Sequence, residues 1–251
     1  MRLNANQVTV VFPGEHGDGL HALGPVSFEV ESGTFVGLLG PSGCGKSTLI
    51  RLFAGLQPPS SGRVTVGGVP VHEPLPQVSI MFQAANLMPW RTVIENIALP
   101  LEIAGVDAKT RRKTAHDLLT GLGLTGFENA YPGELSGGMA QRVALGRVFI
   151  QQPAVLLLDE PFGALDALTR EQISLELLEI WRRQQQTVLM VTHDIQEAVL
   201  LSDRVMVLSR RPGRLVDDIP VTLPRPRHLE MVYSEDFLSI ARRVRQAIDR
   251  A

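Results

Sequence analysis

The sequence predicts an α/β fold with a largely parallel core sheet, an antiparallel β portion near the N-terminus and an inserted helical lobe. Three observations predict it. In the second half of the chain, short apolar runs typical of buried parallel strands alternate with helical periodicity. The first part instead contains short strand patterns joined by turns. Between about residues 86 and 150, only helical patterns occur.

Length and composition fit one large domain or two closely joined lobes. The chain has 251 residues, of which 44% are hydrophobic and 20% charged, as is ordinary for a protein with a sizeable core. The net charge of -2 gives no electrostatic reason to expect nucleic acid as a partner. Cys44 is the only cysteine, which excludes an internal disulfide and indicates a reducing compartment.

Nothing in the sequence predicts membrane insertion or export. No stretch approaches the ~20 apolar residues that span a bilayer. Residues 1–8 lack the apolar core of a signal peptide. We therefore expect that a partner would have to hold this chain at a membrane.

The first part of the chain is expected to form short strands separated by glycine- and proline-rich turns. They are expected at residues 7–12, 26–30, 35–39, 63–66, 69–71 and 78–83, with a loop at 13–19. A helical stretch follows from about Thr92 to His116 and beyond, with interruptions expected at Pro100 and Gly105. It belongs to a helical subdomain, about residues 86–150, inserted into the core.

The second part is expected to complete the parallel core. Buried strands are expected at 153–160, 187–192 and 204–208, a helix at 169–185 and an extended linker at 223–227. A final amphipathic helix carries its apolar face on Phe237, Ile240, Ala241, Val244 and Ile248. We expect one domain over residues 1–225, followed by a linker and C-terminal helix over 226–251.

A glycine-rich stretch between a predicted strand and a predicted helix fits the phosphate-loop pattern G-x-x-x-x-G-K-[ST]. Its residues are Gly40, Pro41, Ser42, Gly43, Cys44, Gly45, Lys46, Ser47 and Thr48. The glycines let backbone N–H groups converge on a phosphate, and the following helix directs its positive end there. Lys46 would contact the β- and γ-phosphates, and the Ser47 hydroxyl would bind Mg²⁺. The strand-loop-helix context favours this over an ordinary glycine-rich turn.

Cys44 lies inside this loop, beside a helix N-terminus and Lys46. Both neighbours favour the thiolate, so a reactive thiol is one expectation. The alternative is a small residue that fills the loop without a chemical role.

Asp159 and Glu160 follow four apolar residues at the end of a predicted buried strand. Two acids in this position are costly unless they bind a cation or accept hydrogen bonds. Beside a phosphate loop, Asp159 suits Mg²⁺ binding and Glu160 suits the general base that orients the attacking water. A solvated turn is the alternative.

A second glycine-rich stretch, Leu135 to Gln141, opens a helix. Ser136 is a good N-cap, and Gly137 and Gly138 expose backbone N–H groups. Taken alone, it is only a capped helix with a glycine-rich entry.

Together these motifs resemble the ATP-binding-cassette ATPases over about residues 5–225. The resemblance rests on their order along the chain. They are Gly40–Thr48, Gln83, Leu135–Gln141, Leu156–Pro161, Ala164–Asp166 and His193.

This resemblance implies ATP and Mg²⁺ as cofactors, and it assigns further site residues. Phe12 matches the aromatic residue that stacks on adenine, although a core strand position is the alternative. Gln83 matches the residue that senses Mg²⁺ and the attacking water, and a polar strand end is its alternative. His193 matches the switch histidine that contacts the γ-phosphate, although a lone histidine is often structural.

The resemblance also implies a two-fold homodimer, because each chain builds two half-sites. Leu135, Ser136, Gly137, Gly138 and Gln141 would close over ATP held by the other subunit. Asp166 would link the two sites across the interface.

Residues 86–93, 190–199 and 209–214 resemble the bacterial importers of nitrate, sulfonates and taurine, a group that also takes up bicarbonate and thiamine precursors. This implies an ATP-hydrolysing subunit at the cytoplasmic face of the inner membrane, coupled to permease subunits and indirectly to a solute-binding protein. Leu87, Met88 and Trp90 are expected to dock the permease, with core burial as the alternative.

Two rival classes fit less well. Soluble ABC ATPases that act in DNA repair, on chromosomes or on ribosomes usually carry coiled-coil inserts, cysteine pairs or tandem cassettes. Exporter ATPases are often fused to membrane spans.

Overall fold

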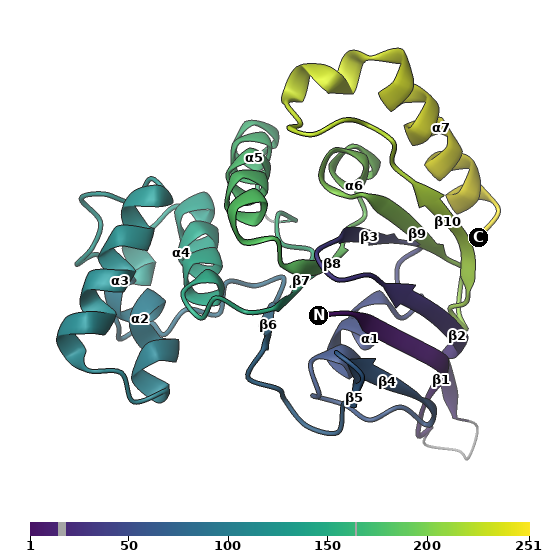
Figure 1. Ribbon diagram of the computed structural model, residues 1–251, viewed down its shortest axis with the longest axis horizontal. Helices are drawn as coiled ribbons and strands as arrows, with labels where there is room; N and C mark the ends of the chain where they lie inside the picture. The colour runs from purple at the N-terminus through teal and green to yellow at the C-terminus, as the bar shows by residue number, and fades with distance from the viewer. Residues whose placement is uncertain (15–18, 164) are drawn as a thin grey trace.

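A six-stranded, mostly parallel sheet forms the centre of the computed structural model, which describes residues 1–14, 19–163 and 165–251 (Figure 1). Its strand order is β10-β9-β3-β8-β7-β6, and only β10 runs antiparallel to its neighbour. The strands are β3 (Phe35–Leu39), β6 (Val78–Met81), β7 (Val155–Asp159), β8 (Thr187–Val191), β9 (Arg204–Leu208) and β10 (Leu215–Pro220). The predicted parallel core is confirmed, and it directs the carboxyl ends of β3, β7 and β8 to one edge.

A second, antiparallel sheet has the order β2-β1-β4-β5. It contains β1 (Leu3–Phe12), β2 (Leu20–Val30), β4 (Ser61–Val66) and β5 (Val69–Pro70). The first strand begins earlier than predicted, because Gln7 has a φ of 49° and the register shifts between Ala5 and Val8. This irregularity breaks the alternation that sequence patterns detect. The loop predicted at 13–19 lies partly outside the described residues.

Helix α1 (Lys46–Phe53) lies between the two sheets and contacts β4, β7 and β8. Four of its apolar side chains, Leu49, Ile50, Leu52 and Phe53, are fully buried there. The Phe53 ring lies 5.8 Å from that of Phe28 on β2. This packing fixes the phosphate loop, which immediately precedes the helix.

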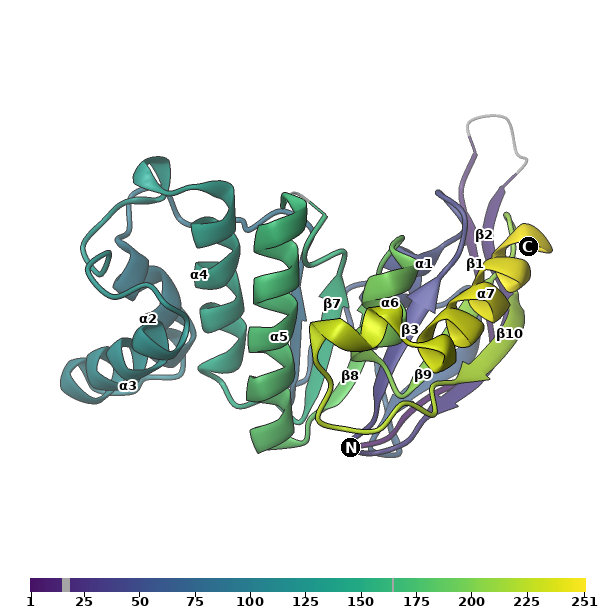
Figure 2. The ribbon, with the colours of Figure 1, turned by 90° about the horizontal axis from the view of Figure 1, so that it is seen from above.

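Helices α4 (Gly137–Phe149) and α5 (Ala167–Gln184) stand side by side near β6 and β7 (Figures 1 and 2). They share a buried cluster with the core strands that includes Phe149 and Trp181. Trp181 meets the Phe35 ring edge-on at 5.7 Å.

The helical lobe is formed by α2 (Val93–Ile103), α3 (Ala108–Gly121) and the adjoining α4, with the short η1 (Pro132–Glu134) before α4. It has a buried cluster of its own. Contrary to the prediction, Pro100 does not interrupt a helix but lies inside α2. The buried residues of α2 all precede Pro100, and their packing keeps the helix continuous although proline has no N–H group to donate. Gly105 does separate α2 from α3.

Gly146 lies inside α4, where alanine would form a better helix. A Cβ atom there would stand 2.9 Å from Leu122 Cδ1 and 3.2 Å from Ile97 Cδ1. The missing side chain therefore lets α4 pack closely against α2 and the end of α3.

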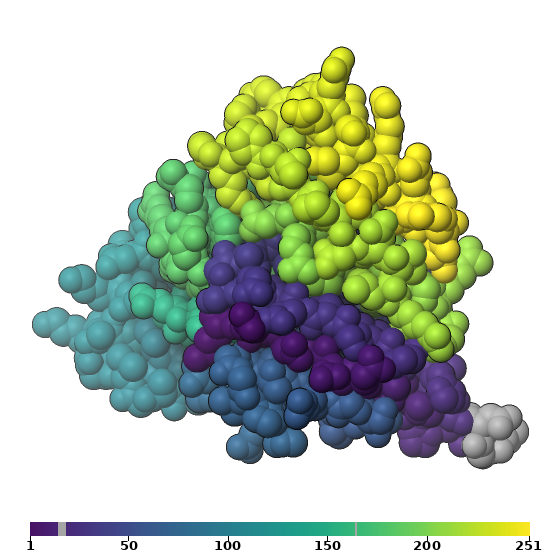
Figure 3. All heavy atoms as spheres, turned by 45° about the vertical axis from the view of Figure 1, so that its right-hand side comes forward, coloured from purple at the N-terminus to yellow at the C-terminus, as the bar shows by residue number. Residues whose placement is uncertain are grey.

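The C-terminal part packs against the core sheet. Helix α6 (Ile195–Leu201) and strand β10 had no predicted counterparts, whereas α7 (Glu235–Asp249) confirms the predicted amphipathic helix. The α7 helix contacts α6, β9, β10 and η2 (Leu229–Tyr233). It forms part of the yellow surface in Figure 3. Arg227, in the segment before it, is buried and donates to the carbonyl groups of Val199 and Leu200 at 3.1 Å.

Among the described residues, no helix combines the length and the apolar character needed to cross a bilayer.

Candidate active site

The phosphate loop connects β3 to α1, and its backbone requires glycine at two positions. Gly43 and Gly45 have φ angles of 75° and 102°, a region that residues with a Cβ avoid. A Cβ atom on Gly45 would also stand 2.5 Å from Leu23 Cδ2. The glycine spacing in the sequence therefore reflects both conformation and close packing.

Lys46 turns back into the loop. Its ammonium group donates to the carbonyl oxygens of Gly40 at 2.8 Å and Pro41 at 3.1 Å. The residue is only 7% exposed. These two carbonyl groups satisfy a charge that would otherwise be costly to bury, and they hold it at the mouth of the loop.

The expectation of a reactive Cys44 thiolate is wrong. Cys44 is 1% exposed, and this burial raises its pKa, outweighing the attraction of Lys46, which lowers it. Burial disfavours the charged form because it removes the water that would solvate it. Cys44 is a protonated, small apolar filler beneath the loop.

Ser47 and Asp159 meet, although they are far apart in sequence. The Ser47 hydroxyl donates to Asp159 Oδ1 at 2.9 Å. Burial raises the pKa of Asp159, and the Ser47 hydrogen bond partly opposes this rise. One carboxylate and one hydroxyl beside a phosphate loop form an oxygen donor set that suits Mg²⁺, which also takes ligands from substrate phosphates and water.

The three predicted catalytic side chains, Glu160, Gln83 and His193, meet at the Glu160 carboxylate. Its Oε2 atom accepts a hydrogen bond from Gln83 Nε2 at 3.4 Å and lies 3.2 Å from His193 Nδ1. Its own backbone is unusual, with a φ of 48°, and its N–H donates to the Val191 carbonyl at 2.9 Å. Such strained backbone is costly and often occurs at functional sites.

These elements border one cleft of about 510 Å³. Its lining runs from the end of β1 across the loop to the strand ends of the core sheet. It consists of Phe12, Leu20, Ala22, Ser42, Gly43, Gly45, Lys46, Ser47, Thr48, Glu160, His193 and Arg211. Phe12 therefore lies in the same cleft as the phosphate loop, as its predicted role requires. Sequence patterns assigned no role in the cleft to Leu20, Ala22 or Arg211, although Arg211 belongs to the 209–214 stretch that resembles the importers.

The second glycine-rich stretch lies elsewhere. Ser136 caps α4 as predicted, since its Oγ accepts from the Met139 N–H at 3.3 Å. Gly137 is exposed, whereas a Cβ atom on Gly138 would stand 2.7 Å from Thr169 Cγ2. Within the described part of the chain, the lining of the cleft includes none of residues 135–141. One chain therefore does not bring this stretch to its own phosphate loop.

Gln141, in the same stretch, is 3% exposed. Its side-chain amide donates to the carbonyl oxygen of Pro161, the residue after Glu160. In this chain it links α4 to the loop that follows β7.

Asp166 caps α5, because its Oδ1 accepts from the Thr169 N–H at 3.0 Å. Asp166 is itself exposed. Ala164, which belongs to the same predicted motif, lies outside the described residues.

Arg170 was not identified from the sequence. It donates to Asp194 Oδ2 at 3.2 Å and to the Leu165 carbonyl at 3.0 Å. It thereby connects the loop that contains Asp166 to the segment after His193.

A separate groove of about 430 Å³ lies between the end of β6, α2 and α4. Met88 lines it, while Leu87 packs against two buried clusters and does not line it. Trp90, two residues after Met88, is 71% exposed. The three predicted docking residues therefore have different surroundings.

Asn96 on α2 holds this segment in place. It is fully buried; its Nδ2 donates to the carbonyl groups of Met88 at 3.1 Å and Arg91 at 3.0 Å. Its Oδ1 accepts from the Met88 N–H at 2.8 Å. The turn that carries Trp90 is thus anchored at both ends.

Comparison with known sequences identifies relatives over most of the chain. The family model described as ABC transporter matches residues 23–163. The taurine import ATP-binding protein of Burkholderia pseudomallei (strain K96243) is 50% identical over 215 residues, covering 86% of this chain and 82% of that protein. The protein of the same name from Rhizobium johnstonii is 46% identical over 214 residues, covering 85% and 82%.

Comparison of structures gives a similar result. A dimeric ATP-binding cassette in a post-hydrolysis state, bound to ADP and phosphate, has a TM-score of 0.78 and 30% sequence identity. The match covers 88% of this chain and all of that one.

Proposed function

Because this chain belongs to the ABC transporter family and is an ATPase, we propose that it is the energy-coupling subunit of a bacterial importer for a small anion such as taurine, another sulfonate or nitrate. The observation that carries the ATPase chemistry is the meeting of Glu160, Gln83 and His193 at one end of the phosphate-loop cleft. The similarity to taurine import proteins supports the anionic cargo.

ATP would bind along the cleft, with adenine against Phe12 and its phosphates in the loop. Lys46 would exchange the Gly40 and Pro41 carbonyl groups for the β- and γ-phosphates. Ser47 and Asp159 would hold Mg²⁺, which when bound offsets the negative charge of the phosphates.

Glu160 is placed to orient the attacking water and to accept its proton. The two neighbours of its Oε2 atom limit the orientations of the carboxylate: the Gln83 amide at 3.4 Å and the His193 ring at 3.2 Å. Residue 160 follows Asp159 directly, so one strand end would deliver both the metal ligand and the base.

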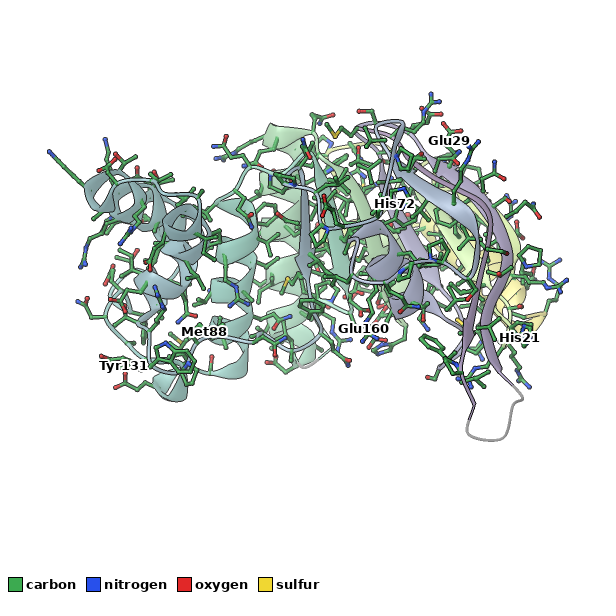
Figure 4. The ribbon with its side chains drawn as sticks, turned by 90° about the horizontal axis from the view of Figure 1, so that it is seen from below. His21, Glu29, His72, Met88, Tyr131 and Glu160 are labelled. Atoms are coloured by element: carbon green, nitrogen blue, oxygen red, sulfur yellow. The ribbon has the colours of Figure 1, made fainter. Side chains whose placement is uncertain are left out.

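A second copy of the chain would complete each site. Ser136 and Gly137 are exposed and lie outside the cleft of their own chain, so their helix N-terminus is available to phosphates bound by another subunit. Tyr131, shortly before this stretch in the chain, lies along the same edge of the molecule as Glu160 (Figure 4), as a face-to-face dimer would require. The dimeric state of the similar cassette supports it too.

The groove beside Met88 would receive a cytoplasmic helix of the permease, and the exposed Trp90, two residues further along the chain, would contact the same helix. Its lining is largely apolar, as suits the core of a protein interface. The complex would hold the ATPase at the cytoplasmic face of the cell membrane, and a solute-binding protein would deliver the cargo.

This proposal is tested in proteoliposomes that contain the chain with its permease subunits. ATP hydrolysis is measured with the solute-binding protein and taurine, an alkanesulfonate, nitrate or a thiamine precursor. We expect one of the anions to stimulate hydrolysis severalfold and to accumulate in the vesicles. Stimulation by the thiamine precursor alone, or by none of the four, would refute the anion assignment.

A further inference from the structure

The turn between β9 and β10, residues 209–214, lies directly against the phosphate loop. Gly213 donates its N–H to the Ala22 carbonyl and accepts from the Gly24 N–H, both at 3.0 Å. A side chain on Gly213 would collide with the carbonyl oxygen of Cys44. The turn is therefore fixed to β2 on one side and to the loop on the other.

The turn is also closed internally. The Ser209 N–H donates to the Arg214 carbonyl at 2.8 Å, and the Arg214 N–H donates to Ser209 Oγ at 3.0 Å. Residues between them, including Arg211, consequently have little freedom to move away from the loop.

Arg211 extends from this turn over the loop. Its Nε donates to the Gly43 carbonyl at 3.1 Å, and one Nη lies 2.9 Å from the position that a Cβ atom on Gly43 would occupy. Gly43 needs to be glycine because its φ is 75°, and a Cβ atom there would push the guanidinium group aside. The same side chain lines the cleft with Lys46 and Phe12.

The charge of the cleft supports a role in binding anions. Lys46 and Arg211 are the lysine and arginine side chains among its described lining residues, and Lys46 already has carbonyl partners. A guanidinium group has five N–H donors in a planar arrangement that matches phosphate oxygens. Nε donates one of them to the Gly43 carbonyl, and among the described residues the Nη groups have no hydrogen-bond acceptor, so they can donate to another group.

We propose that Arg211 is a nucleotide-binding residue: its Nη groups contact a phosphate of bound ATP while its Nε holds the phosphate loop through the Gly43 carbonyl. The contact adds a second cation to the one supplied by Lys46. This inference rests on the ATPase activity of the subunit and is independent of the transported solute and the membrane partner.

The test measures ATP and ADP dissociation constants of the isolated chain by calorimetry, at low and high salt. Arg211→Ala is expected to weaken ATP binding by about 10- to 100-fold, as for the loss of a charged hydrogen bond. The variant should also bind with a weaker salt dependence than the unchanged protein, because one cation has left the site. Arg211→Lys should restore part of the affinity and the salt dependence, since it keeps the charge.

Arg210→Ala is the matched control. It removes the same charge from the same turn, but Arg210, which is exposed like Arg211, does not line the cleft. Its ATP affinity should equal that of the unchanged protein. Thermal unfolding without nucleotide shows whether each variant is folded.

Two results would overturn the proposal. ATP affinity of folded Arg211→Ala within twofold of the unchanged protein would exclude the contact. In the second, Arg211→Ala binds ATP more weakly with an unchanged salt dependence, and Arg211→Lys restores none of the affinity. Arg211 would then only hold the Gly43 carbonyl and would not contact a phosphate. Failure of the unchanged protein to bind ATP would instead count against the ATPase assignment itself, so the two failures are distinguishable.

Discussion

Glu160 and Glu197 both lie close to His193, but they are buried to different depths. Glu160 keeps about a quarter of its side chain exposed and has polar partners in Gln83 and His193. Glu197, on α6, is 8% exposed. Its burial raises its pKa to about 7, which the Thr192 hydroxyl partly opposes. Burial of Glu197 favours its protonated form, because it removes the water that would solvate the charge.

Glu197→Gln is expected to stabilise the chain at pH 8 more than at pH 5. An unfolded glutamate ionises near 4.5, whereas folded Glu197 keeps its proton up to about pH 7. Between these values the folded state binds more protons, so the free energy of unfolding falls as pH rises, by up to about 3 kcal/mol. Glutamine removes this loss.

The measurement is chemical unfolding of both proteins at pH 5 and pH 8. The matched control is Glu171→Gln, which removes an exposed acid from α5. An equal stability difference at both pH values would contradict the expected ionisation of Glu197.

Among the elements, α2 shows how a helix can position a surface without forming it. Its fully buried Asn96 anchors the preceding turn through Met88 and Arg91, so Trp90 remains exposed at a defined place. The helix itself is started by a capping box between Thr92 and Glu95. A large exposed aromatic side chain on a rigid turn suits an interface, because little conformational entropy is lost on binding.

Trp90→Ala is expected to abolish stimulation of ATP hydrolysis by the permease while the isolated subunit keeps its basal activity. The residue is 71% exposed, so its removal leaves no cavity in the core. Removing an aromatic hot-spot contact typically costs about 2 kcal/mol or more in binding, roughly a 30-fold weaker complex. Co-purification and ATPase assays with permease measure both effects.

Tyr233→Ala serves as the control, because it removes another strongly exposed aromatic side chain, 85% exposed, far along the chain in η2. It should assemble and respond normally. Normal stimulation of Trp90→Ala would place the permease contact elsewhere.

At the scale of the whole molecule, the phosphate-loop cleft and the second glycine-rich stretch lie in different parts of one chain, as two proposed half-sites. The phosphate loop and Glu160 border the cleft, whereas Ser136 and its glycines lie on the helical side, outside it. The core sheet and α5 separate them (Figure 2). A two-fold dimer would bring each half to its complement, and nucleotide would then control association.

Glu160→Gln should bind ATP, hydrolyse it at least ~10²-fold more slowly, and accumulate as an ATP-loaded dimer, because glutamine keeps the shape of the side chain without its basicity. Lys46→Ala should lose ATP binding and remain monomeric, since it removes the ammonium group that we propose contacts the phosphates. Size-exclusion chromatography with MgATP and a phosphate-release assay distinguish the two. Hydrolysis by Glu160→Gln at the unchanged rate would move the search for the base to His193.

The sequence by itself determined the features that depend on neighbours within a few residues. The phosphate loop was predictable because Gly43 and Gly45 meet backbone requirements that only glycine satisfies. Ser136 was predictable as an N-cap, and Asp159 and Glu160 as a strand end, because each follows from a short local pattern. These predictions needed no knowledge of what lies across the sheet.

Only the tertiary structure decided the properties that depend on distant neighbours. Cys44 has local neighbours that favour a thiolate, but residues packed around it remove water and reverse the preference. Strand β10 was missed because its pairing with β9, not its own pattern, makes it a strand. Arg211 reaches the phosphate loop from a position 168 residues after Gly43. Burial, pKa and side-chain contacts arise from the packing of segments that are remote in sequence, so local spacing does not encode them.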